Sequence, residues 1–277
     1  MRFTKMHALG NDYIYVDCIR QTPPADPAAL SVALSRPHTG IGADGLILIL
    51  PSPVADARMR IYNADGSEAL MCGNGIRCVG KFLYDSGLCK KETIRVETQS
   101  GIKLLRMQIE DGVAAGASVD MDPPRFDAAS VPVLCEDAQA LRLEAAGHTF
   151  LLHCVSIGNP HAVCFSEPGD ALFYAAGPVL ENHPVFPARA NIEFCAVLNE
   201  HEMRMRVWER GSGETMACGT GATACAVQAI RMGLCQSPVT VHLAGGDLRI
   251  DWDGTSSAFM TGPAHAVFSG EWPAFFG

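Results

Sequence analysis

Two stretches of the chain alternate apolar and polar residues in the manner of half-buried β-strands. They read RMRIYN at 58–63 and RMRVWE at 204–209. A turn rich in Gly and Ser follows each stretch, and mostly apolar segments come next at 76–86 and 222–232. Alternation predicts strands, and long, weakly charged apolar segments predict helices that are buried on most sides.

The ends of the two predicted helices are marked in the same way. Gly87 and Gly233 stand directly after them, where a glycine can adopt the left-handed conformation that terminates a helix. Strand-like segments resume at 93–98 and 239–244. Each half of the chain therefore predicts a strand, a turn, a central helix and a further strand.

A Cys-Gly-x-Gly motif stands directly before each predicted helix. Its cysteines, Cys72 and Cys218, are 146 positions apart, about half the chain. At the same offset MRIYNADGSE (59–68) aligns with MRVWERGSGE (205–214), and Gly-Leu-Cys begins fifteen residues after each cysteine. After a small shift, Gly10-Asn11 pairs with Gly158-Asn159. Matches in the same order predict two copies of one unit, which are too few for a solenoid.

Proline-rich breaks divide the chain between these copies. They lie at 122–124 and 262–263. The predicted first domain comprises residues 1–117 plus 263–277 and carries Cys72, whereas the second comprises residues 118–262 and carries Cys218.

Composition and charge restrict the function classes. Of the 277 residues 48% are apolar and 18% charged, which suits well-filled cores. A net charge of −9 without a basic cluster argues against nucleic-acid binding. Clean apolar runs such as 46–50 are far shorter than a membrane span, and the first residues do not resemble a signal peptide.

The cysteines indicate a reducing compartment. There are 11 of them, scattered along the chain, and none forms a C-x-x-C pair. An odd, dispersed set does not resemble a disulfide framework, so we expect a cytoplasmic protein in which most cysteines are small buried hydrophobes. Cys78 and Cys225, within the two predicted helices, are expected to be packing residues.

Cys72 and Cys218 are expected to have a chemical role. A helix N-terminus offers unpaired N–H groups and partial positive charge, which lower the pKa of a thiol and can hold a substrate carboxylate. Glycines allow a substrate to approach the backbone. Two such thiols facing one substrate could remove a proton from one face of a chiral carbon and return it to the other.

The sequence does not indicate a cofactor. Pyridoxal phosphate needs a Schiff-base lysine, and the second half of the chain contains no lysine. A G-x-G-x-x-G match at 40–45 precedes the strand-like LILIL instead of a helix, so it does not predict dinucleotide binding. We expect neither a cofactor nor a metal.

Several segments resemble the signatures of the diaminopimelate epimerase family. They are NADGSEALMCGNGIRC (63–78), GNPHAV (158–163), ERGSGETMACGTG (209–221), the opening MHALGNDYIYVD and GGDL at 245–248. The resemblance implies an α/β (α+β) fold of two pseudo-symmetric domains, each a mostly antiparallel sheet wrapped around a central helix. It also implies an active site in the interdomain cleft. The implied activity is cofactor-independent interconversion of LL- and meso-2,6-diaminopimelate, for lysine and peptidoglycan biosynthesis, by a homodimer.

The resemblance also implies roles for individual residues. Cys72 would accept the proton and Cys218 donate it in one direction, with the roles exchanged in the other. Glu209 and His161 would assist near the thiols, and Arg210 would clamp the distal carboxylate. The remaining implied substrate contacts are Asn11, Asn63, Gly73, Asn74, Asn159, Asn191, Gly219 and Thr220. Gly45 departs from the glutamine of many members, so no contact is assigned there.

Three other functions remain open from the residues. A related two-thiol epimerase could act on another amino acid, such as histidine or hydroxyproline. A redox or metal-binding protein could use the same thiol pair. A binding module without catalysis would give no reason to duplicate a poised thiol.

Overall fold

The chain folds into two units in the computed structural model, which describes residues 1–273. One unit comprises Met1–Val119 and the chain from Thr261 onward, and the other comprises Asp120–Met260. The predicted domain boundaries fall about two residues from these divisions. The last four residues of the predicted first domain, 274–277, lie outside the described residues.

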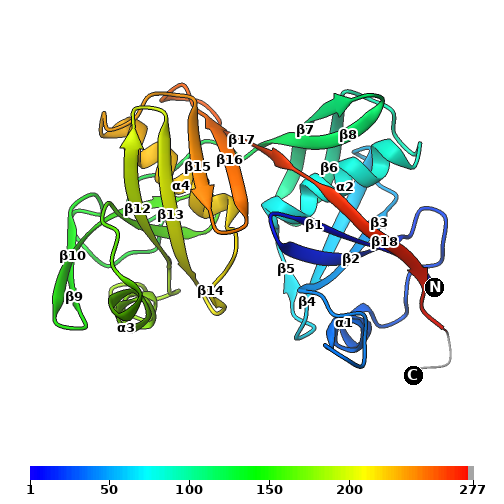
Figure 1. Ribbon diagram of the computed structural model, residues 1–277, viewed down its shortest axis with the longest axis horizontal. Helices are drawn as coiled ribbons and strands as arrows, with labels where there is room; N and C mark the ends of the chain where they lie inside the picture. Colours follow the sequence, from blue (N-terminus) through cyan, green and yellow to red (C-terminus); the bar gives the residue numbers. More distant parts are fainter. Residues whose placement is uncertain (274–277) are drawn as a thin grey trace. The chain divides into compact units, whose positions relative to one another are not determined.

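The first unit is built mainly of strands (Figure 1). Its elements are β1 (Arg2–Ala8), β2 (Asn11–Asp17), α1 (Pro27–Ser35), β3 (Gly45–Leu50), β4 (Ala57–Asn63), β5 (Glu68–Ala69), α2 (Gly73–Asp85), β6 (Thr93–Thr98), β7 (Gly101–Glu110), β8 (Val113–Asp120) and β18 (His265–Glu271). Of these, β8 ends at the first residue of the second unit, and β17 (Phe259–Pro263) spans the return.

The second unit follows the same plan. Its elements are β9 (Leu141–Ala145), β10 (His148–Ser156), β11 (Pro160–Cys164), α3 (Asp170–Glu181), β12 (Asn191–Asn199), β13 (Glu202–Glu209), β14 (Gly213–Glu214), α4 (Gly219–Arg231), β15 (Val239–Leu243) and β16 (Gly246–Asp251).

Strand pairing repeats between the units. In the first, β2 pairs parallel with β3, β3 antiparallel with β4, β4 parallel with β6, and β6 antiparallel with β7. In the second, β11, β12, β13, β15 and β16 pair in the same succession of parallel and antiparallel contacts. Together with the remaining antiparallel pairs, this confirms the predicted fold class of mostly antiparallel sheets.

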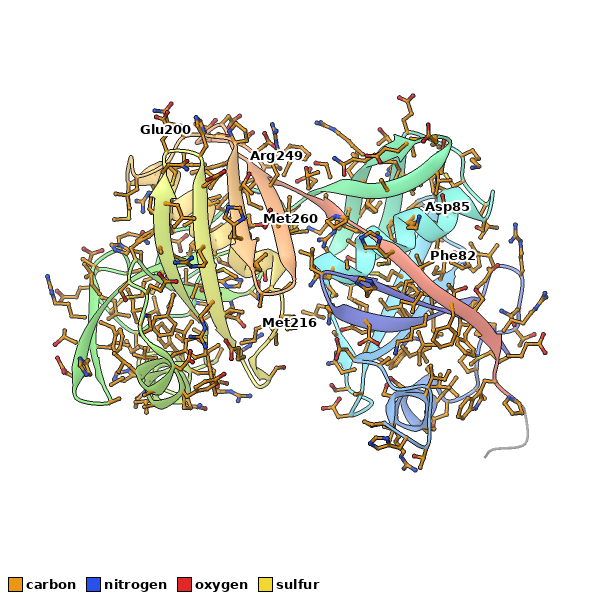
Figure 2. The ribbon with its side chains drawn as sticks, in the orientation of Figure 1. Phe82, Asp85, Glu200, Met216, Arg249 and Met260 are labelled. Atoms are coloured by element: carbon orange, nitrogen blue, oxygen red, sulfur yellow. The ribbon has the colours of Figure 1, made fainter. Side chains whose placement is uncertain are left out.

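Each unit wraps its strands around one helix. Helix α2 contacts β1, β2, β6, β7 and β18, and α4 contacts β10, β11, β12, β13, β15 and β16 (Figure 1). Asp85 lies at the C-terminal end of α2 (Figure 2). It fixes the last turn by accepting hydrogen bonds from Lys81 Nζ at 2.8 Å and the Ala114 N–H at 2.9 Å. Such enclosure explains why both helices are apolar on most sides.

The central helices begin three residues earlier than the sequence pattern indicates, at Gly73 and Gly219. The glycine-rich turns are therefore the first helical turns. Glycine has a low helix propensity, but packing of the surrounding sheet overrides it. The predicted terminators are confirmed, because Gly87 and Gly233 have φ of +75° and +72°.

Helices α1 and α3 were not predicted. Helix α1 begins with the Asp26 carboxylate accepting a hydrogen bond from the Ala29 N–H and has Pro27 at its first position. Helix α3 contains Pro178 in its interior, where a proline in the sequence normally indicates that a helix has ended. No helix among residues 1–273 is long and apolar enough to cross a membrane.

Candidate active site

Cys72 is the N-cap of α2. Its extended backbone (φ −140°, ψ 113°) places the side chain over the first helical turn, and the Gly75 N–H donates to Sγ at 3.3 Å. On its other side the thiol donates to Asn11 Oδ1 at 3.4 Å. Because the N–H groups of a first turn lack helical partners, this sulfur lies where an anion is stabilised.

Tyr13 and Asn11 of β2 are neighbours of Cys72, and Asp44 holds the Asn11 side chain. Asn11 Nδ2 donates to Asp44 Oδ2 at 2.7 Å, which fixes its Oδ1 toward the thiol. Burial, with smaller contributions from Cys72 and Asp44, raises the pKa of the Tyr13 hydroxyl. Tyr13 therefore remains a neutral phenol beside the sulfur.

Arg77 organises the turn that carries Gly73 and Asn74. Its guanidinium is fully buried and donates to Gly73 O at 3.1 Å, Asn74 Oδ1 at 3.0 Å and Pro263 O at 3.2 Å. Burial lowers its pKa to about 10, so it keeps its charge at neutral pH. The Asn74 side chain is thus engaged within the unit.

Asn63 ends strand β4. Its Nδ2 donates to Ser67 Oγ at 3.0 Å, and its N–H donates to Ser67 O at 2.8 Å. These bonds shape the turn between β4 and β5. The opposite strand position is Gly45, where an added Cβ would lie 2.1 Å from Tyr62 O. Close strand packing thus accounts for the glycine at 45.

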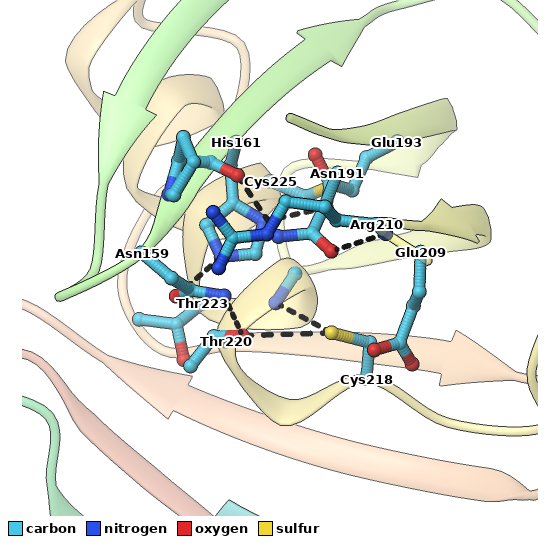
Figure 3. A network of polar contacts seen from close by, with 12 residues as sticks. Asn159, His161, Asn191, Glu193, Glu209, Arg210, Cys218, Thr220, Thr223 and Cys225 are labelled. Carbon is cyan, nitrogen blue, oxygen red and sulfur yellow. Dashed lines mark hydrogen bonds and ion pairs between the residues drawn. The ribbon is translucent and has the colours of Figure 1, made fainter. Parts of the chain in front are cut away.

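Cys218 is the N-cap of α4 and repeats the geometry of Cys72. Its Sγ accepts from the Gly221 N–H at 3.3 Å and lies 3.5 Å from Thr220 Oγ1 (Figure 3). Thr223, one turn further on, donates from Oγ1 to Gly219 O at 2.9 Å. The predicted N-terminal positions of both cysteines are therefore found in the structure.

The neighbours of Cys218 change its acidity. Burial, followed by the carboxylates of Glu209 and Glu193, raises the pKa of the Cys218 thiol well above its ordinary value, against the lowering influence of Thr220 and the Gly221 N–H. The expected net lowering of the pKa is therefore wrong for this thiol, although the helix N-terminus does act in the lowering direction. Desolvation of a thiolate outweighs the helix terminus here.

Glu209 lies at the end of β13 and is itself perturbed. Burial raises the pKa of its carboxyl group, while the hydroxyl of Thr215, which hydrogen-bonds Oε1, and the nearby His161 lower it. A carboxylate with a raised pKa beside a thiol is suited to hold or pass a proton.

His161 is fully buried on β11 between two oxygen partners. Its Nδ1 lies 2.6 Å from Glu193 Oε1, and its Nε2 lies 2.9 Å from Asn159 Oδ1. Asn159 Nδ2 in turn donates to Thr220 Oγ1 at 3.5 Å (Figure 3). The predicted residues His161, Asn159, Thr220 and Cys218 therefore form one connected network.

Asn191 and Arg210 form a second connected pair. Asn191 Nδ2 donates to Pro160 O at 2.9 Å, and its Oδ1 accepts from the Arg210 N–H at 2.9 Å. Asn191 thus fixes the backbone of Arg210. The Arg210 side chain is exposed, and its Nη1 donates to Ala188 O at 3.1 Å.

Sequence reasoning missed five residues of these networks, namely Tyr13, Asp44, Arg77, Glu193 and Thr215. The proximity of Tyr13 and Glu193 to the site depends on which strands pair and in which register, and neither can be read from the sequence. Arg77 could have been found, because an arginine in the first turns of a mostly apolar helix implies a buried partner.

Several solved structures have the same fold, and two of them illustrate it. The phenazine biosynthesis protein of the PhzF family from Bacillus anthracis is 17% identical, with a TM-score of 0.72 and coverage of 99% of both chains. A hydroxyproline epimerase from Agrobacterium vitis, with bound trans-4-OH-L-proline, is 18% identical, with a TM-score of 0.70 and coverage of 98% of this chain and 91% of that one. This protein thus has the two-unit fold found in such epimerases.

The family follows from the sequence comparisons. The diaminopimelate epimerase family model matches residues 3–126 and 153–267. The diaminopimelate epimerase of Pelotomaculum thermopropionicum is 50% identical over 277 residues, with 99% of each chain covered. That of Acetivibrio thermocellus is 49% identical over 276 residues, with 98% of each covered. The chain belongs to the diaminopimelate epimerase family and is an isomerase.

Proposed function

We propose that this enzyme interconverts LL- and meso-2,6-diaminopimelate with Cys72 and Cys218 as its two proton-transfer groups. A thiolate on one side takes the α-proton and becomes a thiol, while the thiol on the other side gives its proton to the opposite face and becomes a thiolate. No electrons leave the substrate, and the proton count is unchanged. The single observation that carries the proposal is the duplicated N-cap thiol, with a glycine N–H 3.3 Å from each sulfur.

The two helix N-termini would stabilise the reacting carboxylate. Removing an α-proton pushes negative charge into that group, and preorganised N–H donors lower the barrier without reorganising. The backbone N–H groups proposed for this are those of Gly73, Asn74, Gly219 and Thr220. The engaged Asn74 side chain supports the backbone role.

Arg210 would select the substrate by its distal carboxylate. A guanidinium offers parallel donors that match a carboxylate, and the Asn191 bond to the Arg210 N–H fixes the start of this side chain. The side chains proposed to complete the substrate site are Asn11, Asn63, Asn159 and Glu209. We propose further that the enzyme needs no cofactor, acts in the cytoplasm for lysine and peptidoglycan precursors, and is a homodimer.

Deuterium incorporation tests this function. Incubation of LL-diaminopimelate with enzyme in heavy water should label Cα and yield the meso isomer, and Cys72→Ala should abolish the conversion. Absence of label with the wild-type enzyme, or full conversion by Cys72→Ala, would refute the proposal. A panel containing histidine and hydroxyproline separates the related epimerases, because preference for either would reassign the substrate but not the chemistry.

A further inference from the structure

Glu193 is a fully buried carboxylate on β12 that is not among the residues proposed to bind or react with the substrate. Its Oε1 lies 2.6 Å from His161 Nδ1, and both side chains are 0% exposed. Its Oε2 makes no hydrogen bond with any residue that the structure describes. A buried carboxylate with an unbonded oxygen lowers stability. This arrangement therefore indicates a purpose other than folding.

The duplicated units show what stability alone would require at this position. Tyr13 pairs with Gly45 across β2 and β3, and His161 pairs with Asn191 across β11 and β12. Gly45 and Asn191 therefore occupy equivalent strand positions. Two residues after them stand Ile47 on β3 and Glu193 on β12, which are counterparts in the same way. The first unit fills this position with an apolar side chain.

Both counterparts pack against the first turn of the central helix. A Cβ added at Gly75 would lie 2.7 Å from Ile47 Cδ1, and one added at Gly221 would lie 2.9 Å from Glu193 Oε1. The carboxylate thus touches the residue whose N–H donates to Cys218. Since isoleucine suffices in the first unit, the glutamate is specific to the surroundings of Cys218.

The contact with Glu193 fixes the orientation of the His161 ring. Glu193 Oε1 faces Nδ1 at 2.6 Å and Asn159 Oδ1 faces Nε2 at 2.9 Å, and because both oxygens are acceptors, both ring nitrogens are placed as donors. The ring orientation then fixes Nε2 at Asn159, whose amide continues to Thr220 and the thiol. Carboxylates that orient a histidine in this way are common at sites of proton transfer.

We infer that Glu193 is a positioning residue for the epimerisation, which holds the His161 ring and its proton so that the network reaching Cys218 keeps one arrangement. The inference rests on the proposed two-thiol function and concerns the Cys218 side alone. Glu193 does not itself touch the substrate.

Two substitutions distinguish the effect of the hydrogen-bond acceptor at residue 193 from the effect of its negative charge. Glu193→Ile installs the residue of the first unit and removes the acceptor, whereas Glu193→Gln keeps an amide oxygen. We expect kcat to fall about 100-fold in Glu193→Ile and less in Glu193→Gln, with KM within about 3-fold of wild type in both. Glu202→Gln, an exposed change on the neighbouring strand β13, should leave both parameters unchanged.

Spectroscopy of His161 provides a readout that a merely structural role would not move. The wild-type enzyme should show a strongly downfield imidazole N–H proton, assigned by its loss in His161→Gln. This N–H resonance should disappear in Glu193→Ile, whereas the rate at which iodoacetamide alkylates Cys72 should stay unchanged. A retained resonance in Glu193→Ile, or kcat within about 3-fold of wild type, would overturn the inference. If Glu193→Ile does not fold, Glu193→Gln decides by the same criteria of kcat and resonance position.

A double variant tests whether Glu193 acts through His161. If it does, His161→Gln with Glu193→Ile should be no slower than His161→Gln alone, since the second change removes nothing further. If the fold-losses in kcat of the two single variants multiply in the double variant, the inference is contradicted.

Deuterium labelling by the wild-type enzyme separates the two proposals. Without labelling the two-thiol function fails and the imidazole resonance alone decides whether Glu193 holds His161, whereas labelling with normal Glu193 variants refutes only the inference.

Discussion

Cys72 and Cys218 occupy the same place in their units, each at the N-cap of the central helix with a glycine N–H 3.3 Å from Sγ. Their neighbours differ. Tyr13 stands where the second unit has His161, and Ile47 where it has Glu193. Duplication has kept the backbone that holds a sulfur at a helix N-terminus, while the side chains around it have diverged.

The divergence gives Cys218 a charged setting. Its thiol lies near Glu209, whereas the aligned position in the first unit is the neutral Asn63. Burial and carboxylates raise the pKa of Cys218, so this thiol retains its proton. That supports the proposed role of Cys218 as the proton donor in one direction.

The largest effect is expected from the helix position where the units differ most in structure. Arg77 donates to Gly73 O, Asn74 Oδ1 and Pro263 O, whereas the hydroxyl of its aligned residue Thr223 donates to Gly219 O. Arg77→Leu should lower the free energy of unfolding by about 3 kcal/mol, because buried acceptors lose a charged donor. Thr223→Val should lower it by about 1 kcal/mol. Urea unfolding followed by circular dichroism measures both.

Arg249→Leu provides the control for removing an arginine. Arg249 is exposed on β16 and pairs with Asp251 (Figure 2), so its loss should change the free energy of unfolding by less than about 0.5 kcal/mol. Equal losses in Arg77→Leu and Thr223→Val would show that the two helix starts depend on their side chains alike.

A second prediction concerns the carboxylate beside Cys218. Glu209→Gln makes this position neutral, like Asn63, and should lower kcat about 100-fold if Glu209 assists proton transfer. It should also move the alkylation of Cys218 to lower pH, since Glu209 raises the pKa of the thiol and its removal lowers it. Mass spectrometry of iodoacetamide-labelled peptides across pH measures this shift.

Cys72 is the internal control for that shift. Glu209 is a neighbour of Cys218 within the second unit, so the pH dependence of Cys72 alkylation should move less than that of Cys218. Glu200→Gln, an exposed carboxylate change in the second unit, should leave both thiols and kcat unaltered. A Cys218 profile that stays in place or moves to higher pH would contradict the assigned influence of Glu209.

The local pattern predicted much of the fold. Alternation located β4 and β13, and the repeated cysteine motif located both central helices and their glycine terminators. The first turns of α2 and α4 were missed because glycine disfavours a helix in isolation, and only the enclosing sheet overrides that preference. Helix α3, which contains Pro178, was missed for a similar reason.

The site was predictable where function leaves a motif. Cys218, Thr220 and His161 were named from short segments, and the structure joins them in one network. Glu193 lies in an ordinary strand, and its importance depends on which residue pairs with His161 and which helix turn it touches. The acidity of Cys218 likewise depends on burial, which overrides the local influence of the helix N-terminus.

The smallest effect is expected at the glycines of the two first turns. A methyl group at Gly75 would meet the terminal carbon of Ile47, which can rotate away, whereas one at Gly221 would press on Glu193 Oε1 at 2.9 Å and Cys218 Sγ at 3.2 Å. Gly221→Ala should therefore lower kcat about 10-fold, and Gly75→Ala less than about 3-fold. Steady-state kinetics with matched melting temperatures measures the pair. A larger loss in Gly75→Ala would mean that the apolar side of the duplication holds its thiol more rigidly than the charged side.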